Sequence, residues 1–267
     1  MEKKTLITAV ICDLDGTLLD TENATKNILK EFLGRYGKAV DAGKEERRLG
    51  KMFKESAVDI VRDYALPMSA EEYAQAIMPL YHQKWNQAKP LPGVNRLLSH
   101  LHNRGVPLAL ASNSVKKHIE MKISHQQGWK EIFSVVLGGD EVNHGKPAPD
   151  IFLEAAKRLG VDPSNCLVIE DSPVGVRAAK ASGAKVVAVP SLQNQDDQYS
   201  IADTVLRSLL EFQPELWSLP AFEDWVQNVL PIDPLHVRGV IGGGVYHDGY
   251  TSFDIVSGKW QPICFSS

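Results

Sequence analysis

Cysteine is scarce in this chain. The sequence has 3 cysteines in 267 residues, and Cys12, Cys166 and Cys264 lie far apart, with no CxxC pair and no Cys/His cluster. This pattern predicts neither a disulfide framework nor a zinc site. Free thiols at predicted strand positions fit a reducing compartment, so we expect a cytoplasmic protein.

Basic charge and long apolar runs are also lacking. The 29 basic and 33 acidic residues give a formal net charge of −4, so no basic field favours nucleic acid or an anionic membrane surface as a partner. No run approaches the ~20 apolar residues of a membrane span. The N-terminal stretch MEKKTLITAVICD is too short for a secretory signal and lacks a cleavage site. We therefore expect no nucleic-acid partner and no membrane partner.

Five short apolar runs are present, each bounded by turn-forming residues. They are continuous rather than alternating, which is typical of strands covered on both faces. Helical patterns lie between them, and two of these end at Gly160 and Gly183, as helices often do. Alternating strands and helices predict an α/β fold with a doubly wound parallel sheet. The runs are residues 5–12, 106–112, 134–139, 166–171 and 185–190.

One region interrupts the alternation directly after the first strand. Residues 21–91 contain no convincing strand and show helical spacing, for example through Ile28, Phe32 and Tyr36. Such an insert lies over the edge where open α/β sheets bind ligands, which favours a functional cap over a mere decoration. The predicted parts are a core of residues 1–18 and 92–210, a helical cap of residues 19–91, and a connector with a glycine-rich tail of residues 211–267.

Polar residues stand at the ends of the predicted strands. The carboxyl ends of parallel strands meet at one edge of a sheet, so four carboxylates would face one lysine there. A divalent cation would offset their mutual repulsion, and hard oxygen ligands favour Mg²⁺. Each residue taken alone is more often a turn former, a helix cap or a solvated side chain. The set consists of Asp13 and Asp15, Ser112, Lys146, and Glu170 with Asp171.

The combined set predicts phosphoryl transfer. Aspartate serves as a nucleophile through an aspartyl-phosphate, and a neighbouring carboxylate can move protons, which would explain the Asp13–Asp15 pair. The transferred group needs charge stabilisation from a metal, a lysine, a hydroxyl group and backbone N–H groups. Gly16 permits the close backbone approach that such N–H donors require.

The segments DLDGT (13–17), GKP (145–147) and ED (170–171), with a serine at a strand end between the first two, resemble the haloacid dehalogenase superfamily. The resemblance implies that Asp13 is the nucleophile and Asp15 the general acid/base. It also implies that the helical insert is that superfamily's cap. The dehalogenases lack an acid at the position of Asp15, so dehalogenation is not expected. The implied substrate-binding residues are Thr17, Ser112, Asn113, Lys146 and Lys51, and the implied Mg²⁺ ligands are Asp13, the carbonyl of Asp15, Asp171, and Glu170 through water.

Longer stretches of sequence resemble particular members of this superfamily. Residues 91–114, 144–159 and 166–176 resemble the FMN phosphatase part of plant bifunctional riboflavin kinase/FMN phosphatases, and are similar also to pseudouridine-5′-phosphatases and glycerol-phosphate phosphatases. We therefore expect a Mg²⁺-dependent phosphomonoesterase acting on a small phosphate ester, FMN first. The alternatives are another ester among these, a phosphosugar mutase of the same fold, or an idle binding module.

Two further expectations concern the cap and the tail. The cap should set specificity. Helical spacing places most of its candidates in the interior of the cap, so we expect at most two of them to touch substrate: Lys51, Phe53, Tyr64, Tyr73, Tyr81 and Trp85. A kinase domain would need roughly a further hundred residues, so we expect no kinase activity in the residues after Pro231. We expect the glycine-rich residues from Arg238 onward to be only weakly or locally ordered.

Overall fold

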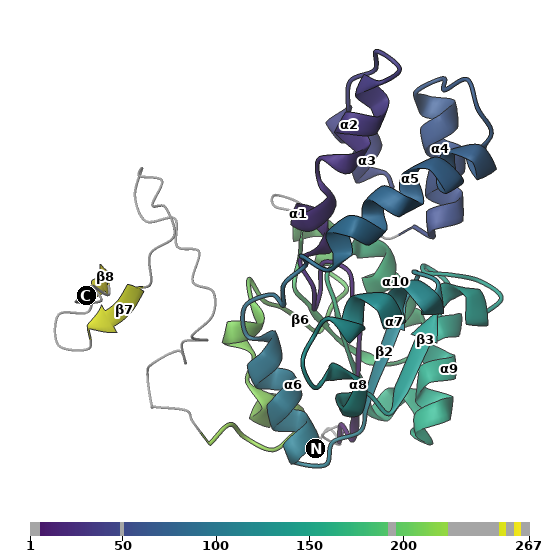
Figure 1. Cartoon of the computed structure of the whole chain (residues 1–267). Coiled ribbons are helices and arrows are strands. Elements are labelled where there is room, and N and C mark those ends of the chain that lie inside the picture. The colour runs from purple at the N-terminus through teal and green to yellow at the C-terminus, as the bar shows by residue number, and fades with distance from the viewer. Residues whose placement is uncertain (1–5, 49–50, 192–195, 224–250, 255–258, 263–267) are drawn as a thin grey trace.

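The computed structural model describes residues 6–48, 51–191, 196–223, 251–254 and 259–262 (Figure 1). Its centre is a parallel sheet with the strand order β3-β2-β1-β4-β5-β6. The predicted doubly wound parallel sheet is confirmed, and each of the five predicted runs contains a strand. The short β6 lies beyond the last predicted run. The strands are β1 (Ala9–Cys12), β2 (Leu108–Ser112), β3 (Val135–Gly138), β4 (Cys166–Glu170), β5 (Lys185–Ala188) and β6 (Thr204–Val205).

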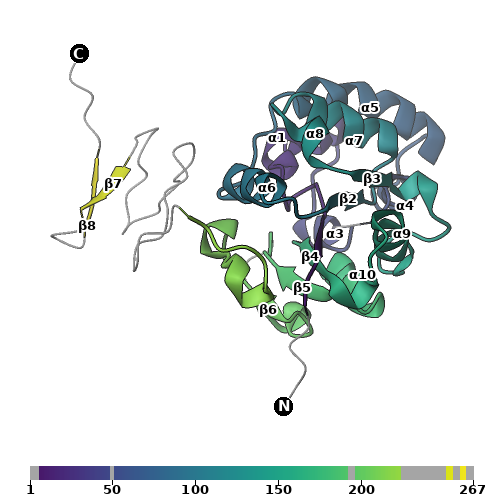
Figure 2. The same ribbon diagram turned by 90° about the horizontal axis from the view of Figure 1, so that it is seen from below.

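Both faces of the sheet are buried, which explains why its strands are continuously apolar. Side chains of a strand alternate between faces, so Val10 and Cys12 lie in one hydrophobic cluster while Ala9 and Ile11 lie in the other. Helices α6, α7 and α8 cover the first face, and helices α9 and α10 cover the second (Figure 2). These helices are α6 (Val94–Asn103), α7 (Lys116–Ser124), α8 (Trp129–Ile132), α9 (Asp150–Leu159) and α10 (Pro173–Ala181).

The stretch between β1 and α6 forms a helical unit at one end of the core (Figure 1). It has its own apolar cluster, in which the fully buried Phe32 and Tyr73 meet edge to face with ring centroids 5.2 Å apart. Ser69 and Glu72 form a capping box that begins its longest helix. The unit contains α1 (Thr21–Thr25), α2 (Ile28–Gly34), α3 (Ala42–Glu46), α4 (Phe53–Asp63) and α5 (Ala70–Trp85), and we call it the cap.

Two linkers join the cap to the core, and they lie side by side. The amide of Asp20 donates to the carbonyl of Lys89 at 2.9 Å, and the amide of Leu91 donates to the carbonyl of Leu18 at 2.9 Å. The chain therefore leaves the core and returns to it at neighbouring points, next to the carboxyl end of β1.

The connector packs onto the core as far as it is described. Leu209, Phe212, Leu219 and Phe222 all belong to the hydrophobic cluster on the α6 face of the sheet. That the core ends at residue 210 stays a prediction, but these side chains extend its apolar packing to Phe222. Two 3₁₀ turns shape this segment, η4 (Leu209–Glu211) and η5 (Pro214–Trp217), and three others lie earlier, η1 (Gly139–Glu141), η2 (Pro163–Asn165) and η3 (Asp196–Tyr199).

Replacing Phe222 by alanine should destabilise the protein. The ring is 7% exposed and lies against Arg96, whose guanidinium carbon is 3.4 Å from the ring centroid. We expect the free energy of unfolding to fall by about 3 kcal/mol, as for other phenylalanine-to-alanine changes in a core. Urea denaturation of Phe222→Ala measures this. Leu216→Ala is the control, because Leu216 is 64% exposed in the same connector and should change stability by less than about 0.5 kcal/mol. Equal losses in the two variants would show that the connector is not part of the core.

The expectations about the tail concern residues that are mostly outside the described ranges. Only two short strands are described there, β7 (Thr251–Asp254) and β8 (Lys259–Pro262), and they pair antiparallel. The predicted weak order of the tail and the expected absence of kinase activity remain predictions. Among the described residues, no helix is both long enough and apolar enough to cross a membrane.

Candidate active site

Asp13 lies directly after β1, at the carboxyl edge of the sheet. Its carboxylate is buried, and Oδ1 accepts a hydrogen bond of 2.6 Å from Nζ of Lys146. The same ammonium group donates to Glu170 Oε1 at 2.7 Å and to the carbonyl oxygen of Ala111 at 3.0 Å. All three of its protons therefore have partners, which fixes Lys146 beside Asp13. The sheet thus brings together Asp13, Lys146 and Glu170, as the strand-end pattern predicts.

Glu170 ends β4 and is held by two sets of donors. Its Oε1 faces Lys146, while Oε2 accepts from the amide and the hydroxyl group of Ser172 at 2.8 and 3.0 Å. A Cβ atom at Gly175 would overlap the Glu170 carboxylate, so this side chain occupies space that only glycine leaves free. Both Glu170 oxygens already have partners, which suits a residue that orients its neighbours.

Asp171 faces Asp13 across a shared hydroxyl group. Thr17 Oγ1 lies 2.8 Å from Asp171 Oδ1 and 3.1 Å from Asp13 Oδ2. Gly16 has φ of 86°, and a Cβ atom there would lie 2.4 Å from Asp171 Oδ2. A side chain at position 16 would therefore both strain the backbone and displace a carboxylate of the site.

The excess of negative charge perturbs these groups. Burial, helped by the charges of Glu170 and Asp15, raises the pKa of Asp13 to about 7, although Lys146 acts in the opposite direction. Burial and the charges of Glu170 and Asp13 also raise the pKa of Asp171. Burial disfavours the charged form of Lys146, but Asp13 and Glu170 prevail and raise its pKa. One buried ammonium group thus cannot balance the charge of three carboxylates.

This charge excess fits a divalent cation. Asp13, Glu170 and Asp171 each present an oxygen within 4.8 Å of the others, and all three are buried. Glu170 accepts three hydrogen bonds, from Lys146 and from the amide and hydroxyl group of Ser172. Asp13 and Asp171 share the single hydroxyl proton of Thr17 on their facing oxygens, so these two carboxylates are the better placed to coordinate an ion directly. Buried oxygens with uncompensated charge are the donor set of Mg²⁺ and similar hard cations.

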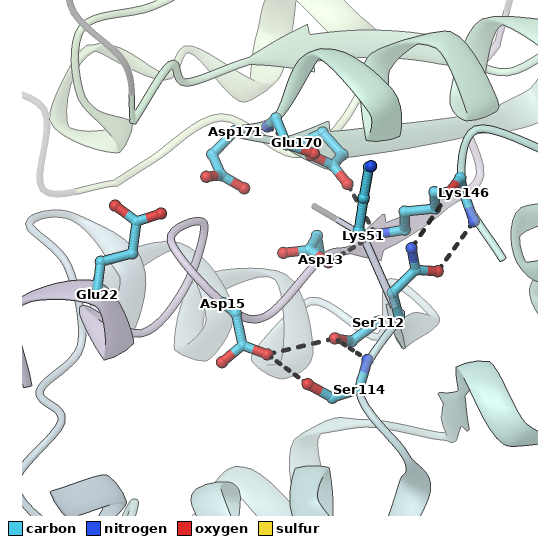
Figure 3. A pocket seen from close by; sticks show the side chains of 11 residues that line it. Asp13, Asp15, Glu22, Lys51, Ser112, Ser114, Lys146, Glu170 and Asp171 are labelled. Atoms are coloured by element: carbon cyan, nitrogen blue, oxygen red, sulfur yellow. Dashed lines mark hydrogen bonds and ion pairs between the residues drawn. The ribbon is translucent and has the colours of Figure 1, made fainter. Parts of the chain in front are cut away.

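The carboxylate of Asp15 points in a different direction from that of Asp13. Its Oδ2 accepts from Ser114 Oγ at 2.8 Å, with Ser112 Oγ at 3.5 Å, and Figure 3 shows the carboxylate directed toward these two serines. Nζ of Lys122 lies 2.7 and 2.8 Å from its two oxygens. Burial would raise the pKa of Asp15, but the charge and hydrogen bonds of Lys122, with Ser114, hold that pKa below its usual range.

These residues line a pocket between the core and the cap (Figure 3). Lys51 and Glu22 reach it from the cap side, and Lys51 also forms an ion pair of 2.9 Å with Asp59. The lining is Asp13, Asp15, Glu22, Lys51, Ser112, Asn113, Ser114, Lys146, Glu170, Asp171 and Ser172.

Not every predicted site residue reaches the pocket. Thr17 is 1% exposed and lies behind Asp13 and Asp171 rather than among the lining residues. Asn113 lies at the pocket and accepts from the Lys146 amide at 2.9 Å through Oδ1. Of the cap candidates, only Lys51 lines the pocket among the described residues. The aromatic candidates pack inside the cap or at its base: Phe53, Tyr64, Tyr73, Tyr81 and Trp85.

Four residues in or beside the site are not predicted from the sequence: Glu22, Ser114, Ser172 and Lys122. Three of these carry a signal. Ser114 and Ser172 each lie two residues after the end of a strand whose end is predicted to belong to the site. Lys122 shares the apolar side of α7 with Ile119 and Ile123, and a lysine on an apolar stripe requires a buried partner. Glu22 lies in a short helix of the cap, and nothing in its local sequence distinguishes it.

Comparisons with known proteins agree with this geometry. Residues 7–183 match the model of a hydrolase family described as haloacid dehalogenase-like hydrolase. Over 238 residues the chain is 52% identical to a bifunctional riboflavin kinase/FMN phosphatase of Arabidopsis thaliana, an alignment that covers 89% of this chain and 63% of that protein. The chain thus spans less than two thirds of the length of this relative.

Two further similarities extend over nearly the whole of the other protein. A probable pseudouridine-5′-phosphatase of Drosophila melanogaster is 41% identical over 223 residues, which is 82% of this chain and 96% of that protein. Among solved structures, CbbY from Rhodobacter sphaeroides in complex with phosphate superimposes with a TM-score of 0.68 at 26% identity, covering 77% of this chain and 96% of that one.

Proposed function

This chain belongs to the haloacid dehalogenase-like hydrolases, and from that premise we propose that it hydrolyses a small phosphate monoester through an aspartyl-phosphate on Asp13. One observation carries the proposal: Asp13 stands at a strand end with Lys146 on one oxygen at 2.6 Å and Asp171 across the hydroxyl group of Thr17. A nucleophilic carboxylate needs such a fixed position, and a cation beside it lowers the repulsion of an incoming dianion.

The proposed reaction has two steps. In the first, a carboxylate oxygen of Asp13 bonds to phosphorus, the bond from phosphorus to the ester oxygen breaks, and Asp15 in its protonated form gives its proton to the leaving oxygen. The low pKa of Asp15 makes that form a strong acid and a minor species at neutral pH. In the second, water bonds to phosphorus, the bond from phosphorus to Asp13 breaks, and Asp15 takes the water proton. Lys146 and the pocket hydroxyl of Ser112 stabilise charge on the phosphoryl oxygens.

Mg²⁺ is the cofactor we propose for this site. Asp13 and Asp171 would hold it, and Glu170 would act through water because its oxygens already accept from Lys146 and Ser172. When bound, the ion would neutralise phosphoryl oxygens and align the ester with the nucleophile. The chain's own part is to present two carboxylates from neighbouring strand ends while Lys146 keeps Asp13 oriented.

FMN is the substrate we propose first, with the reaction taking place in the cytoplasm. The similarity to the Arabidopsis FMN phosphatase supports the substrate, and the unpaired buried thiols of Cys12 and Cys166 support the compartment. Trp85 and Phe53 are not among the lining residues, so the described part of the pocket offers FMN polar contacts. Glu22 can accept from ribityl hydroxyl groups, and Lys51 can donate to an acceptor beyond the phosphate.

A phosphate-release screen tests this proposal. Purified protein with Mg²⁺ is given FMN, glycerol 3-phosphate, pseudouridine 5′-phosphate and p-nitrophenyl phosphate, and kcat/KM is measured for each. We expect free phosphate from several esters and a kcat/KM for FMN at least about tenfold above the others, or roughly 1.4 kcal/mol of discrimination. If the protein prefers glycerol 3-phosphate, the proposed substrate is wrong but the proposed reaction stands. No phosphate release from any ester would overturn the proposed function.

Replacing Asp15 by alanine should slow the hydrolysis of esters with poor leaving groups more than that of esters with good leaving groups. General acid catalysis typically contributes about 100- to 10,000-fold, and only a poor leaving group needs the proton. We expect kcat/KM for glycerol 3-phosphate to fall by at least about a hundredfold in Asp15→Ala, and that for p-nitrophenyl phosphate by less than about tenfold. We compare kcat/KM between the variant and the unmodified protein, because kcat/KM does not depend on the later hydrolysis of the phosphoenzyme. Equal losses for the two esters would mean that Asp15 is structural.

A further inference from the structure

Lys122 is a buried lysine outside the pocket lining. Its side chain is 3% exposed and lies on α7 beside the buried Ile119 and Ile123. An ammonium group removed from water is tolerated only when charged or polar partners replace its hydration. The partners of Lys122 therefore indicate what this residue does.

Its charged partner is Asp15. Nζ of Lys122 lies 2.7 Å from Oδ1 and 2.8 Å from Oδ2 of Asp15, and 3.1 Å from Oγ of Ser114. Ser114 in turn donates to Oδ2 of Asp15 at 2.8 Å. Both oxygens of the carboxylate are thus held by a core helix and its preceding loop, and Figure 3 shows Asp15 directed to this side of the pocket, away from Asp13.

A residue of the cap also packs against the ammonium group of Lys122. Nζ lies 4.6 Å from the centroid of the Trp85 ring, close enough for a cation–π contact. Trp85 is the last residue of α5 and is itself packed against the rings of His118 and His82, each with its centroid 5.0 Å from that of Trp85. The contact joins the cap, just before its second linker, to the helix that holds Asp15.

We propose that Lys122 is a positioning residue for Asp15, and that Trp85 of the cap keeps Lys122 in place. This inference rests on the proposed function, in which Asp15 gives a proton to the leaving oxygen and later takes one from water. Lys122 does not touch the ester. It restricts rotation of the Asp15 side chain and stabilises the carboxylate that remains after the proton has left.

Loss of Lys122 should therefore have the same selective effect as Asp15→Ala, a larger loss of kcat/KM for the ester with the poorer leaving group, but a smaller one. Lys122→Met keeps a side chain of similar length without the charge. We expect kcat/KM for glycerol 3-phosphate to fall about thirtyfold and that for p-nitrophenyl phosphate by less than about threefold, because only the first leaving group needs an oriented acid. A merely structural role would lower both values alike.

Trp85 gives a second, independent test. Trp85→Leu removes the ring over the ammonium group, whereas Trp85→Phe keeps one. We expect Trp85→Leu to lower kcat/KM for glycerol 3-phosphate about fivefold with little change for p-nitrophenyl phosphate, and Trp85→Phe to stay within about twofold of the unmodified protein. The double variant Lys122→Met/Trp85→Leu should be no worse than Lys122→Met alone, since both act through one contact.

Lys117→Met is the matched control on the same helix. Lys117 is exposed, so its loss should leave both kcat/KM values within about twofold. A thermal melt followed by circular dichroism identifies any variant that does not fold, and if Lys122→Met is such a variant the Trp85 pair decides the question. Equal loss on the two esters, or an unchanged kcat/KM for glycerol 3-phosphate, would overturn the inference. If the unmodified protein hydrolyses none of the esters, the proposed function fails instead.

Discussion

Replacing Asp13 by asparagine is expected to abolish turnover while the fold is kept. An amide cannot form the acyl phosphate, and asparagine can still accept a hydrogen bond from Lys146, so the buried network loses a charge rather than a partner. We expect kcat to fall at least about a thousandfold on every ester, including p-nitrophenyl phosphate, because the nucleophile is needed whatever the leaving group. Rapid quenching followed by intact-mass measurement should detect a phosphorylated protein only when Asp13 is present.

The same variant should be more stable than the unmodified protein when no metal is bound. The pKa of Asp13 is about 7 in the folded state, against 3.8 for an unperturbed aspartate, so the folded state holds this proton more tightly. Ionising Asp13 therefore costs stability progressively as the pH rises from about 4 to 7, and the full cost is present above pH 7. Asp13→Asn lacks that cost.

We therefore expect Asp13→Asn to melt a few degrees higher than the unmodified protein at pH 8 in EDTA, with a gap that closes toward pH 4. Substantial turnover by pure Asp13→Asn would contradict the nucleophile. A lower melting temperature at pH 8 would contradict the charge argument alone.

Removing the metal is the second change for which we expect a very large effect. Asp13 and Asp171 are buried carboxylates whose charge Lys146 cannot balance alone, and a phosphate dianion would add to the repulsion. We expect excess EDTA to lower kcat at least about a thousandfold and added Mg²⁺ to restore it, since the ion supplies several kcal/mol of charge stabilisation. Ca²⁺ should restore little, because its larger and looser coordination misplaces the attacking oxygen.

A measurement that does not depend on activity checks the site itself. Mg²⁺ that binds the folded state should raise the melting temperature of the unmodified protein in a concentration-dependent way. Asp171→Asn should lose most of that rise, whereas Asp203→Asn, which removes a surface carboxylate paired with Lys180 and Lys185, should keep it. Full activity in EDTA, or an equal shift in both variants, would show that no metal acts at this site.

The strand ends could be predicted from the sequence because one topological rule places them. Asp13, Glu170 and Asp171 follow continuous apolar strands, and parallel strands present their carboxyl ends at one edge. Lys146 could be assigned with them because it shortly precedes a helical pattern and because of the resemblance of its GKP segment. Their contacts in the structure match this expected convergence, while their catalytic roles remain predictions.

The residues that could not be predicted depend on contacts between distant segments. Lys122 meets Asp15 across 107 positions of sequence, so its apolar neighbours on the helix indicate that it has a buried partner but not which residue that partner is. Trp85 is one of the cap residues that the sequence offers as specificity candidates, but its ring packs on Lys122 and two histidines instead. Helical spacing shows that a side chain is on an apolar face, but it does not show which surface covers that face.

The central place of β1 in the sheet has a consequence for how the chain folds during synthesis. Val10 pairs with Leu108 on one side and with Leu167 on the other, so β1 leaves the ribosome well before either of its partner strands has been made. The cap is complete at Trp85 and depends on contacts close in sequence, which form quickly. We therefore expect a nascent chain with a folded cap and an unpaired apolar β1. Chaperones that bind exposed strands would act on this intermediate, and slow release of β4 would prolong its exposure to aggregation.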